Sequence, residues 1–150
     1  MFIILFIYIL FIYIYIYYMK LNMLYKAKLI KNIAFFLFFI MFIYSGINKI
    51  LKFNNKTIIL QKKINLPYSI CAFGMVLVIL LETIGSLIIY YNLFNKNKIR
   101  IITNITYLLF LLFLIVVTFI YHPPTDKIIP FLSNVTTFAG LLYLYADFMN

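Results

Sequence analysis

Long apolar runs separated by short basic stretches dominate the chain. Three of these runs are mainly apolar and at least 21 residues long: Leu66–Asn92, Ile101–Tyr121 and Ile128–Met149. A membrane-spanning helix needs about 20 predominantly apolar residues, so each run predicts one span. A fourth run, Asn32–Asn48, counts only 17 residues. It reaches spanning length if Leu29–Ile30 extend the helix and the next lysine turns its ammonium towards the interface.

A further apolar run lies at the N-terminus. Phe2–Met19 is 18 uninterrupted apolar residues that end at Lys20. A cleavable signal would show a small-residue cleavage site, but no Ala, Gly or Ser occurs before Ala27. Two interpretations remain open. Residues 1–19 form an additional N-terminal transmembrane anchor helix, or they lie upstream of a later start at Met19 or Met23.

The stretches between the runs are polar and mostly short. Lys20–Lys31 is a basic connection, and Lys49–Asn65 is a basic amphipathic one that either lies flat on the membrane surface or is a solvated loop. Asn92–Arg100 is a polar turn, and paired prolines make 122–127 another. Short connections make neighbouring helices antiparallel. We therefore predict an all-α integral membrane four-helix bundle over residues 29–149, with the additional N-terminal helix.

Composition supports this class. The chain is 67% hydrophobic with a mean hydropathy of +1.09, whereas a soluble domain is nearer half apolar. The net charge of +10 does not indicate nucleic acid as a partner, because twelve of the thirteen basic residues lie in the three longer inter-span stretches. There they face water and anionic headgroups. The partners expected are the lipid bilayer and either another membrane protein or a second copy.

Basic residues give a weak orientation signal. With the Lys20–Lys31 side cytoplasmic, that face carries seven basic residues and the opposite face six. We adopt this orientation as the expectation. The identity of the membrane is not indicated by the sequence.

The residues needed for metal or nucleophilic chemistry are scarce. One histidine, one cysteine and three acidic residues, widely scattered, provide no metal-ligand spacing. The single Cys71 excludes an internal disulfide, and its position within a span favours a packing role. No catalytic residue and no cofactor is evident from the residues themselves.

Glu82 is the exception, because it lies near the middle of the Leu66–Asn92 span. An acid at membrane depth is costly and by default suggests a functional site. Helical spacing places it on one face with small residues, which allow a neighbouring helix to approach. That face consists of Cys71, Gly74, Val78, Glu82, Gly85 and Ile89. The glycines expected at helix contacts are Gly46, Gly74, Gly85 and Gly140.

Placing the other polar residues by depth predicts a polar cleft open at one membrane face. Its floor is Glu82, and its lining is Ser45, Asn48, Lys49, His122 and Asn134. Glu82 follows Pro67 by fifteen residues, about 22 Å of helix. We therefore expect no simple salt bridge between Lys49 and Glu82. Three roles for Glu82 remain open: a hydrogen bond that fixes packing, a proton- or quinone-linked role, and ligand contact. His122 is either an exposed turn residue or a ligand or proton-relay group.

Four motifs in order carry a family resemblance. The spans end in or contain SGINKI, LLETIGSLIIYY, FLIVVTFIYH and FLSNVTTFAGLLYLY, and the residues that match are Gly46, Lys49, Glu82, Gly85, Thr118, His122, Asn134 and Gly140. Over about residues 29–146 the chain resembles the DoxX family of small four-span membrane proteins. The resemblance implies a membrane subunit linked to thiosulfate:quinone oxidation or to oxidative-stress complexes, with quinone as the implied cofactor. The Phe2–Met19 run falls outside the family pattern.

Three functions follow as hypotheses. The first is a DoxX-like multi-pass membrane subunit, non-catalytic and redox- or quinone-linked. The second is a small transporter or ligand-binding membrane protein that uses the cleft around Glu82. The third is a cargo-receptor-like or structural membrane protein.

Overall fold

The computed structural model describes the backbone of residues 2–94, 99–125 and 128–149, and the side chains of Lys20 and of residues 23–93, 99–125 and 128–149. The described backbone is helical apart from short links, and the all-α prediction is confirmed. Among the described residues, four helical segments are long and apolar enough to cross a membrane: Met23–Leu51, Tyr68–Leu93, Arg100–Tyr121 and Ile128–Met149. The chain divides into two compact units, residues 1–38 and residues 39–150.

The first unit is a single helical segment. It is the first part of α1, which runs without interruption over Phe2–Leu51. The basic stretch Lys20–Lys31 is helical and continues α1 without a break. Lysine has a good helix propensity and its long stem tolerates apolar neighbours, so four lysines do not end a helix that contains no Gly or Pro before Gly46. Whether Phe2–Met19 is a span of its own lies outside the described side chains.

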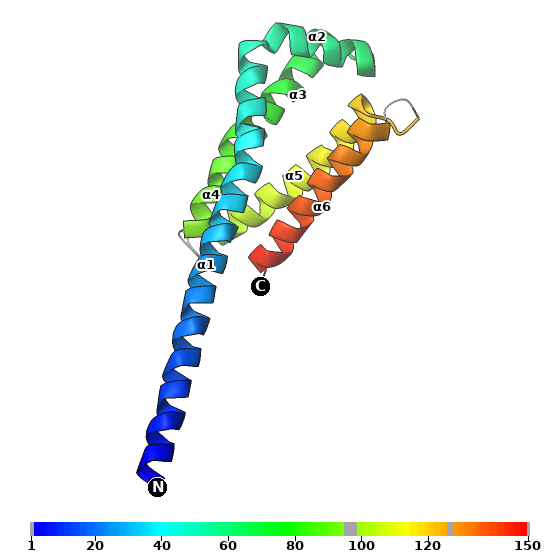
Figure 1. Ribbon diagram of the computed structural model, residues 1–150. Coiled ribbons are helices and arrows are strands. Elements are labelled where there is room, and N and C mark those ends of the chain that lie inside the picture. The colour runs from blue at the N-terminus through cyan, green and yellow to red at the C-terminus, as the bar shows by residue number, and fades with distance from the viewer. Residues whose placement is uncertain (1, 95–98, 126–127, 150) are drawn as a thin grey trace. The chain divides into compact units, whose positions relative to one another are not determined.

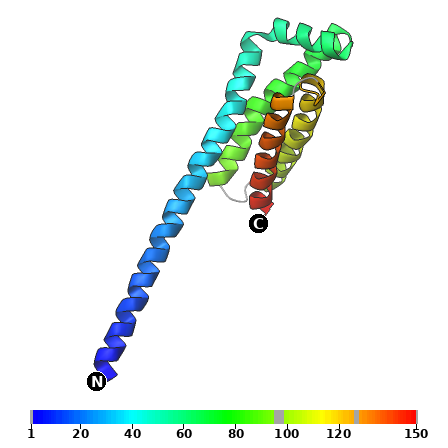
Figure 2. The same ribbon diagram turned by 45° about the vertical axis from the view of Figure 1, so that its right-hand side comes forward.

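The second unit, hereafter the bundle unit, holds the end of α1 and the remaining helices. They are α2 (Phe53–Ile64), α3 (Tyr68–Leu80), α4 (Ser86–Phe94), α5 (Arg100–Tyr121) and α6 (Ile128–Met149). In both views α5 and α6 run side by side as a hairpin (Figures 1 and 2). The helix α2 lies across the end of the unit at which α1 ends and α3 begins (Figure 1).

The central span is a helix with one irregular turn. Pro67 precedes α3, and a π-helical turn, η1 (Leu81–Gly85), joins α3 to α4. A π-turn inserts one extra residue into an α-helix and is frequent at functional sites. Glu82, Gly85 and Ser86, at and directly after this turn, are all buried.

Aromatic packing on both sides of α5 forms much of the core. Phe110 contacts Phe39 and Phe42 of α1 edge-on, with ring centroids 6.1 and 5.0 Å apart. Nearer the start of α5, Tyr107 packs on Tyr145 and Phe148 of α6. Of the four spanning segments α5 has the largest buried share and α6 the smallest, so α5 is the central helix of the bundle unit.

The basic connection Lys49–Asn65 is resolved as a helix rather than a loop. α2 contacts α3 and α5, and Thr57 on its inner face is fully buried. The exposed Lys63 donates to the carbonyl of Ile120 at 3.5 Å, and its ammonium lies 5.3 Å from the centroid of the Tyr121 ring. The helix ends at Asn65, which adopts a left-handed conformation with φ 53°, as is common just after a helix C-terminus. These contacts fix α2 to the end of α5.

Candidate functional site

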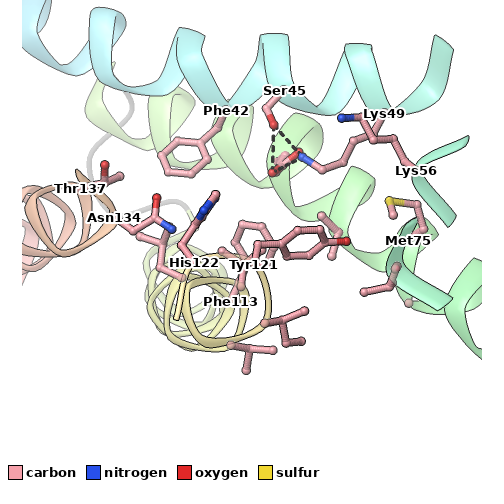
Figure 3. A pocket seen from close by; sticks show the side chains of 18 of the residues that line it. Phe42, Ser45, Lys49, Lys56, Met75, Phe113, Tyr121, His122, Asn134 and Thr137 are labelled. Carbon is pink, nitrogen blue, oxygen red and sulfur yellow. Dashed lines mark hydrogen bonds and ion pairs between the residues drawn. The ribbon is translucent and has the colours of Figure 1, made fainter. Parts of the chain in front are cut away.

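Glu82 forms a compact polar cluster with two residues of α1. The Lys49 ammonium donates to both carboxylate oxygens at 2.7 Å and to the Ser45 hydroxyl at 2.6 Å. The Ser45 hydroxyl donates in turn to Glu82 Oε1 at 3.3 Å. The Glu82 side chain is 3% exposed and that of Lys49 is 19% exposed. Figure 3 shows the cluster between α1 and the central span.

The cluster satisfies its own hydrogen-bonding groups. A lysine ammonium has three donors, and all three are used by Ser45 and Glu82. The charges of Lys49 and Glu82 cancel. This arrangement makes the cluster a structural clamp between α1 and the central span, because a buried pair is tolerated only when its remaining groups are also bonded.

The expectation that Lys49 and Glu82 could not pair is wrong. It placed Lys49 at the membrane face and Glu82 about 22 Å deeper, as if the helices were parallel and their ends level. In the structure Gly46 lies directly against the Glu82 turn: a Cβ on Gly46 would come within 2.6 Å of Thr83 Cγ2 and 3.3 Å of Glu82 Cβ. Lys49 is one turn further on, and side chains on a helix tilt towards its N-terminus, so its ammonium reaches the carboxylate.

Two hydroxyl groups bond to carbonyls at the irregular turn. Ser86 Oγ, fully buried, donates to the carbonyl of Glu82 at 2.7 Å, while its own N–H bonds to Thr83. Thr83 Oγ1 donates to the carbonyl of Ile79 at 2.7 Å. Both are i to i−4 bonds of the kind that threonines also make in the regular helices α5 and α6. At η1 they link the irregular turn that carries Glu82 to its own helix.

A cavity of about 540 Å³ lies in the bundle unit beside this cluster. Its walls are mainly apolar, including Met41, Phe42, Met75, Val78, Phe113 and Leu114. Of the residues that the sequence placed in a cleft, five line the cavity: Ser45, Lys49, Glu82, His122 and Asn134. Asn48 is half-buried and is not part of the lining.

The glycines predicted at helix contacts behave differently from one another. Gly46 and Gly85 are both at close contacts; a Cβ on Gly85 would come within 3.1 Å of Phe110 and Thr106. The prediction for Gly74 is wrong, since a Cβ there would meet nothing within 4 Å and the residue lines the cavity. Gly140 is half-buried on α6.

Several polar groups around the cavity have no partner among the described residues. The Nδ1 atom of His122 is buried and has no hydrogen-bond partner among the described residues. Lys56, half-buried on α2, lines the cavity without a carboxylate partner in the described part of the chain. Asn134 and His122 lie next to each other in Figure 3, and Lys56 lies towards its other side. These groups, rather than Glu82, are available to a ligand.

Lys56 was missed by the sequence reasoning. It is one of five lysines in the Lys49–Asn65 stretch, and nothing singled it out there. The available signal was helical spacing: Lys56, Leu60 and Ile64 follow one another at steps of four and all line the cavity. This spacing becomes informative only once the stretch is known to be a helix and the face of that helix that lines the cavity is known.

The described residues contain no group of three His, Cys, Asp or Glu side chains that could hold a metal ion. No family model, no curated protein and no solved structure matches the chain.

Proposed function

We propose that this protein binds a small, mainly apolar ligand within the membrane, as a ligand-binding or transport protein. The observation that carries the proposal is the 540 Å³ cavity with apolar walls and a few convergent polar groups. Ligand pockets typically have volumes of about 300–1,000 Å³ and this distribution of lining groups. The Ser45–Lys49–Glu82 cluster holds one wall in place, and His122, Asn134 and Lys56 provide the polar contacts.

Gly74 allows a direct test. An added Cβ at Gly74 meets nothing within 4 Å and the residue lines the cavity, so we expect Gly74→Leu to keep the fold and to reduce the volume open to a ligand. An alkyl alcohol carrying a diazirine is photo-crosslinked to the protein in phosphatidylcholine nanodiscs, and labelled peptides are mapped by mass spectrometry. We expect saturable labelling around Met75 and Phe113, both in the lining, and its loss in the variant.

The control is built into the same experiment. Phe119 and Leu112 are exposed on α5, and their labelling from the lipid should not change in Gly74→Leu. Ala139→Leu, on an exposed position of α6, should leave both patterns unchanged. Labelling of the cavity residues that neither saturates nor responds to Gly74→Leu would contradict the proposal.

A second candidate is the DoxX-like, quinone-linked membrane subunit. The unpaired His122 Nδ1 and the Asn134 amide beside an apolar wall fit the carbonyl oxygen and flat ring of a quinone. A quinone would supply two-electron, two-proton carrier chemistry there. Competition of the diazirine label by a short-chain quinone, lost in His122→Phe, would favour this candidate over a ligand without carbonyl acceptors.

A further inference from the structure

We infer that the ligand of this cavity is a single-chain amphiphile with an anionic head group, and that Lys56 pairs with that head. The inference rests on the proposed function and adds the chemical class of the ligand. It follows from three features of the bundle unit: the charges of the lining, the position of α2, and the size and shape of the apolar part.

The charges of the lining do not balance. The described lining residues include two lysines and one carboxylate. Glu82 gives both oxygens to Lys49, so it cannot also neutralise Lys56. Lys56 is half-buried in the lining and has no carboxylate partner among the described residues. An anionic group on the ligand supplies the counter-charge and a charge-assisted hydrogen bond.

Lys56 and His122 both lie towards one end of the bundle unit, but on different sides of the cavity (Figure 3). Lys63, seven residues after Lys56 on α2, contacts Ile120 and Tyr121 at the end of α5. His122 follows directly, so Lys56 and His122 both belong to the end of the bundle unit that α2 covers. A span ends at the membrane interface, so the polar groups are at the depth of lipid head groups.

The apolar part of the cavity extends away from this end. Glu82 lies fifteen residues beyond Pro67 along the central span, and the lining also includes Met41, Phe42 and Leu114. A head group at Lys56 leaves the mainly apolar walls, which include Met75 and Val78, to the alkyl chain. A volume of about 540 Å³ is in the range for a drug-sized ligand such as a single-chain amphiphile.

The test compares ligands with the same chain and different heads. Full-length protein in phosphatidylcholine nanodiscs is titrated with oleate, oleoyl lysophosphatidic acid and oleyl alcohol, each as a competitor of the diazirine label. We expect one of the two anionic ligands to compete about tenfold better than the alcohol, since a hydrogen bond to a charged group contributes about 1.5 kcal/mol or more. The better of oleate and the lysophosphatidate identifies a carboxylate or a phosphate head.

Variants distinguish the inference from the proposed function. Lys56→Gln should remove the preference for anionic heads but leave competition by oleyl alcohol unchanged. Lys62→Gln, an exposed position on the same helix and outside the lining, is the matched control and should keep the preference. Equal competition by all three ligands that is still lost in Gly74→Leu overturns the anionic head and leaves the cavity function standing. No saturable competition by any of them overturns both.

Discussion

Lys49, Ser45 and Glu82 show how a charged residue is accommodated inside an apolar bundle. The carboxylate accepts three hydrogen bonds from two residues of α1, and the pair carries no net charge. Replacing both partners by apolar groups is often nearly neutral, whereas removing one leaves a buried charge. The role of Glu82 that the structure supports is therefore positional: it joins α1 to the central span and shapes one wall of the cavity.

The first prediction concerns this pair. Lys49→Met leaves Glu82 without its ion-pair partner and should lower the free energy of unfolding by about 3 kcal/mol. The double variant Lys49→Met/Glu82→Met should recover most of that loss, because no buried charge remains. Equilibrium unfolding in mixed detergent micelles measures both, with Lys62→Met as the surface control. The single variant Glu82→Met completes the comparison. If the double variant lost as much free energy of unfolding as the two single variants added together, the pair would not be coupled.

The second prediction uses two glycines of opposite environment. At Gly46 an added Cβ would meet Thr83 Cγ2 at 2.6 Å. Thr83 cannot turn away without breaking its 2.7 Å bond to Ile79. Gly46→Ala should therefore destabilise the protein by about 1–3 kcal/mol. Gly74→Ala meets nothing and should stabilise it by about 0.5–1 kcal/mol, because alanine loses less backbone entropy in a helix. The same unfolding measurement compares them, and equal effects would refute the contact at Gly46.

At the scale of elements, the irregular turn η1 is the feature that orients the central span. The extra residue rotates the part of the helix that follows it, so Glu82 faces α1 while Gly85 faces Phe110 and Thr106 of α5. Glu82 and Gly85, within one turn of the chain, therefore contact two different neighbours of the central span.

The third prediction tests the support of this turn. Ser86→Ala removes the buried hydroxyl that donates to the Glu82 carbonyl at 2.7 Å and should destabilise the protein by about 1 kcal/mol. Thr136→Ala removes a hydroxyl with the same kind of backbone bond on the exposed side of α6, and should change stability by less than half as much. Thermal unfolding in detergent, followed by circular dichroism, measures the difference. Equal losses would mean that the Ser86 bond has no special role at η1.

At the scale of the whole molecule, four segments of the described chain are long and apolar enough to cross a membrane. We therefore predict that α2 and the α5–α6 turn lie on one side of the membrane and Met149 on the other. The basic residues counted in the sequence do not decide which side is cytoplasmic.

The fourth prediction tests this arrangement by labelling with a membrane-impermeant maleimide in sealed vesicles. Lys62→Cys and Thr125→Cys, both exposed, should be labelled from one side and Met149→Cys from the other. The native Cys71 is 1% exposed and should remain unlabelled, so it provides the background control. Labelling of Thr125→Cys and Met149→Cys from the same side would contradict an α5–α6 hairpin that crosses the membrane.

The sequence by itself determined the class of the protein and most of its spans. A sufficiently long apolar run in a bilayer forms a helix, because a helix hydrogen-bonds its own backbone N–H and C=O groups where no water is present. It also identified Glu82, because an acid in such a run is conspicuous. The tertiary structure alone decided that α1 is continuous, that Lys49 reaches Glu82, that Gly74 faces open space and that Lys56 lines the cavity. These four features depend on how the helices cross one another and on the extra residue at η1. The sequence pattern shows neither the crossing nor the extra residue, because it was interpreted with regular helices whose ends lie at the same depth.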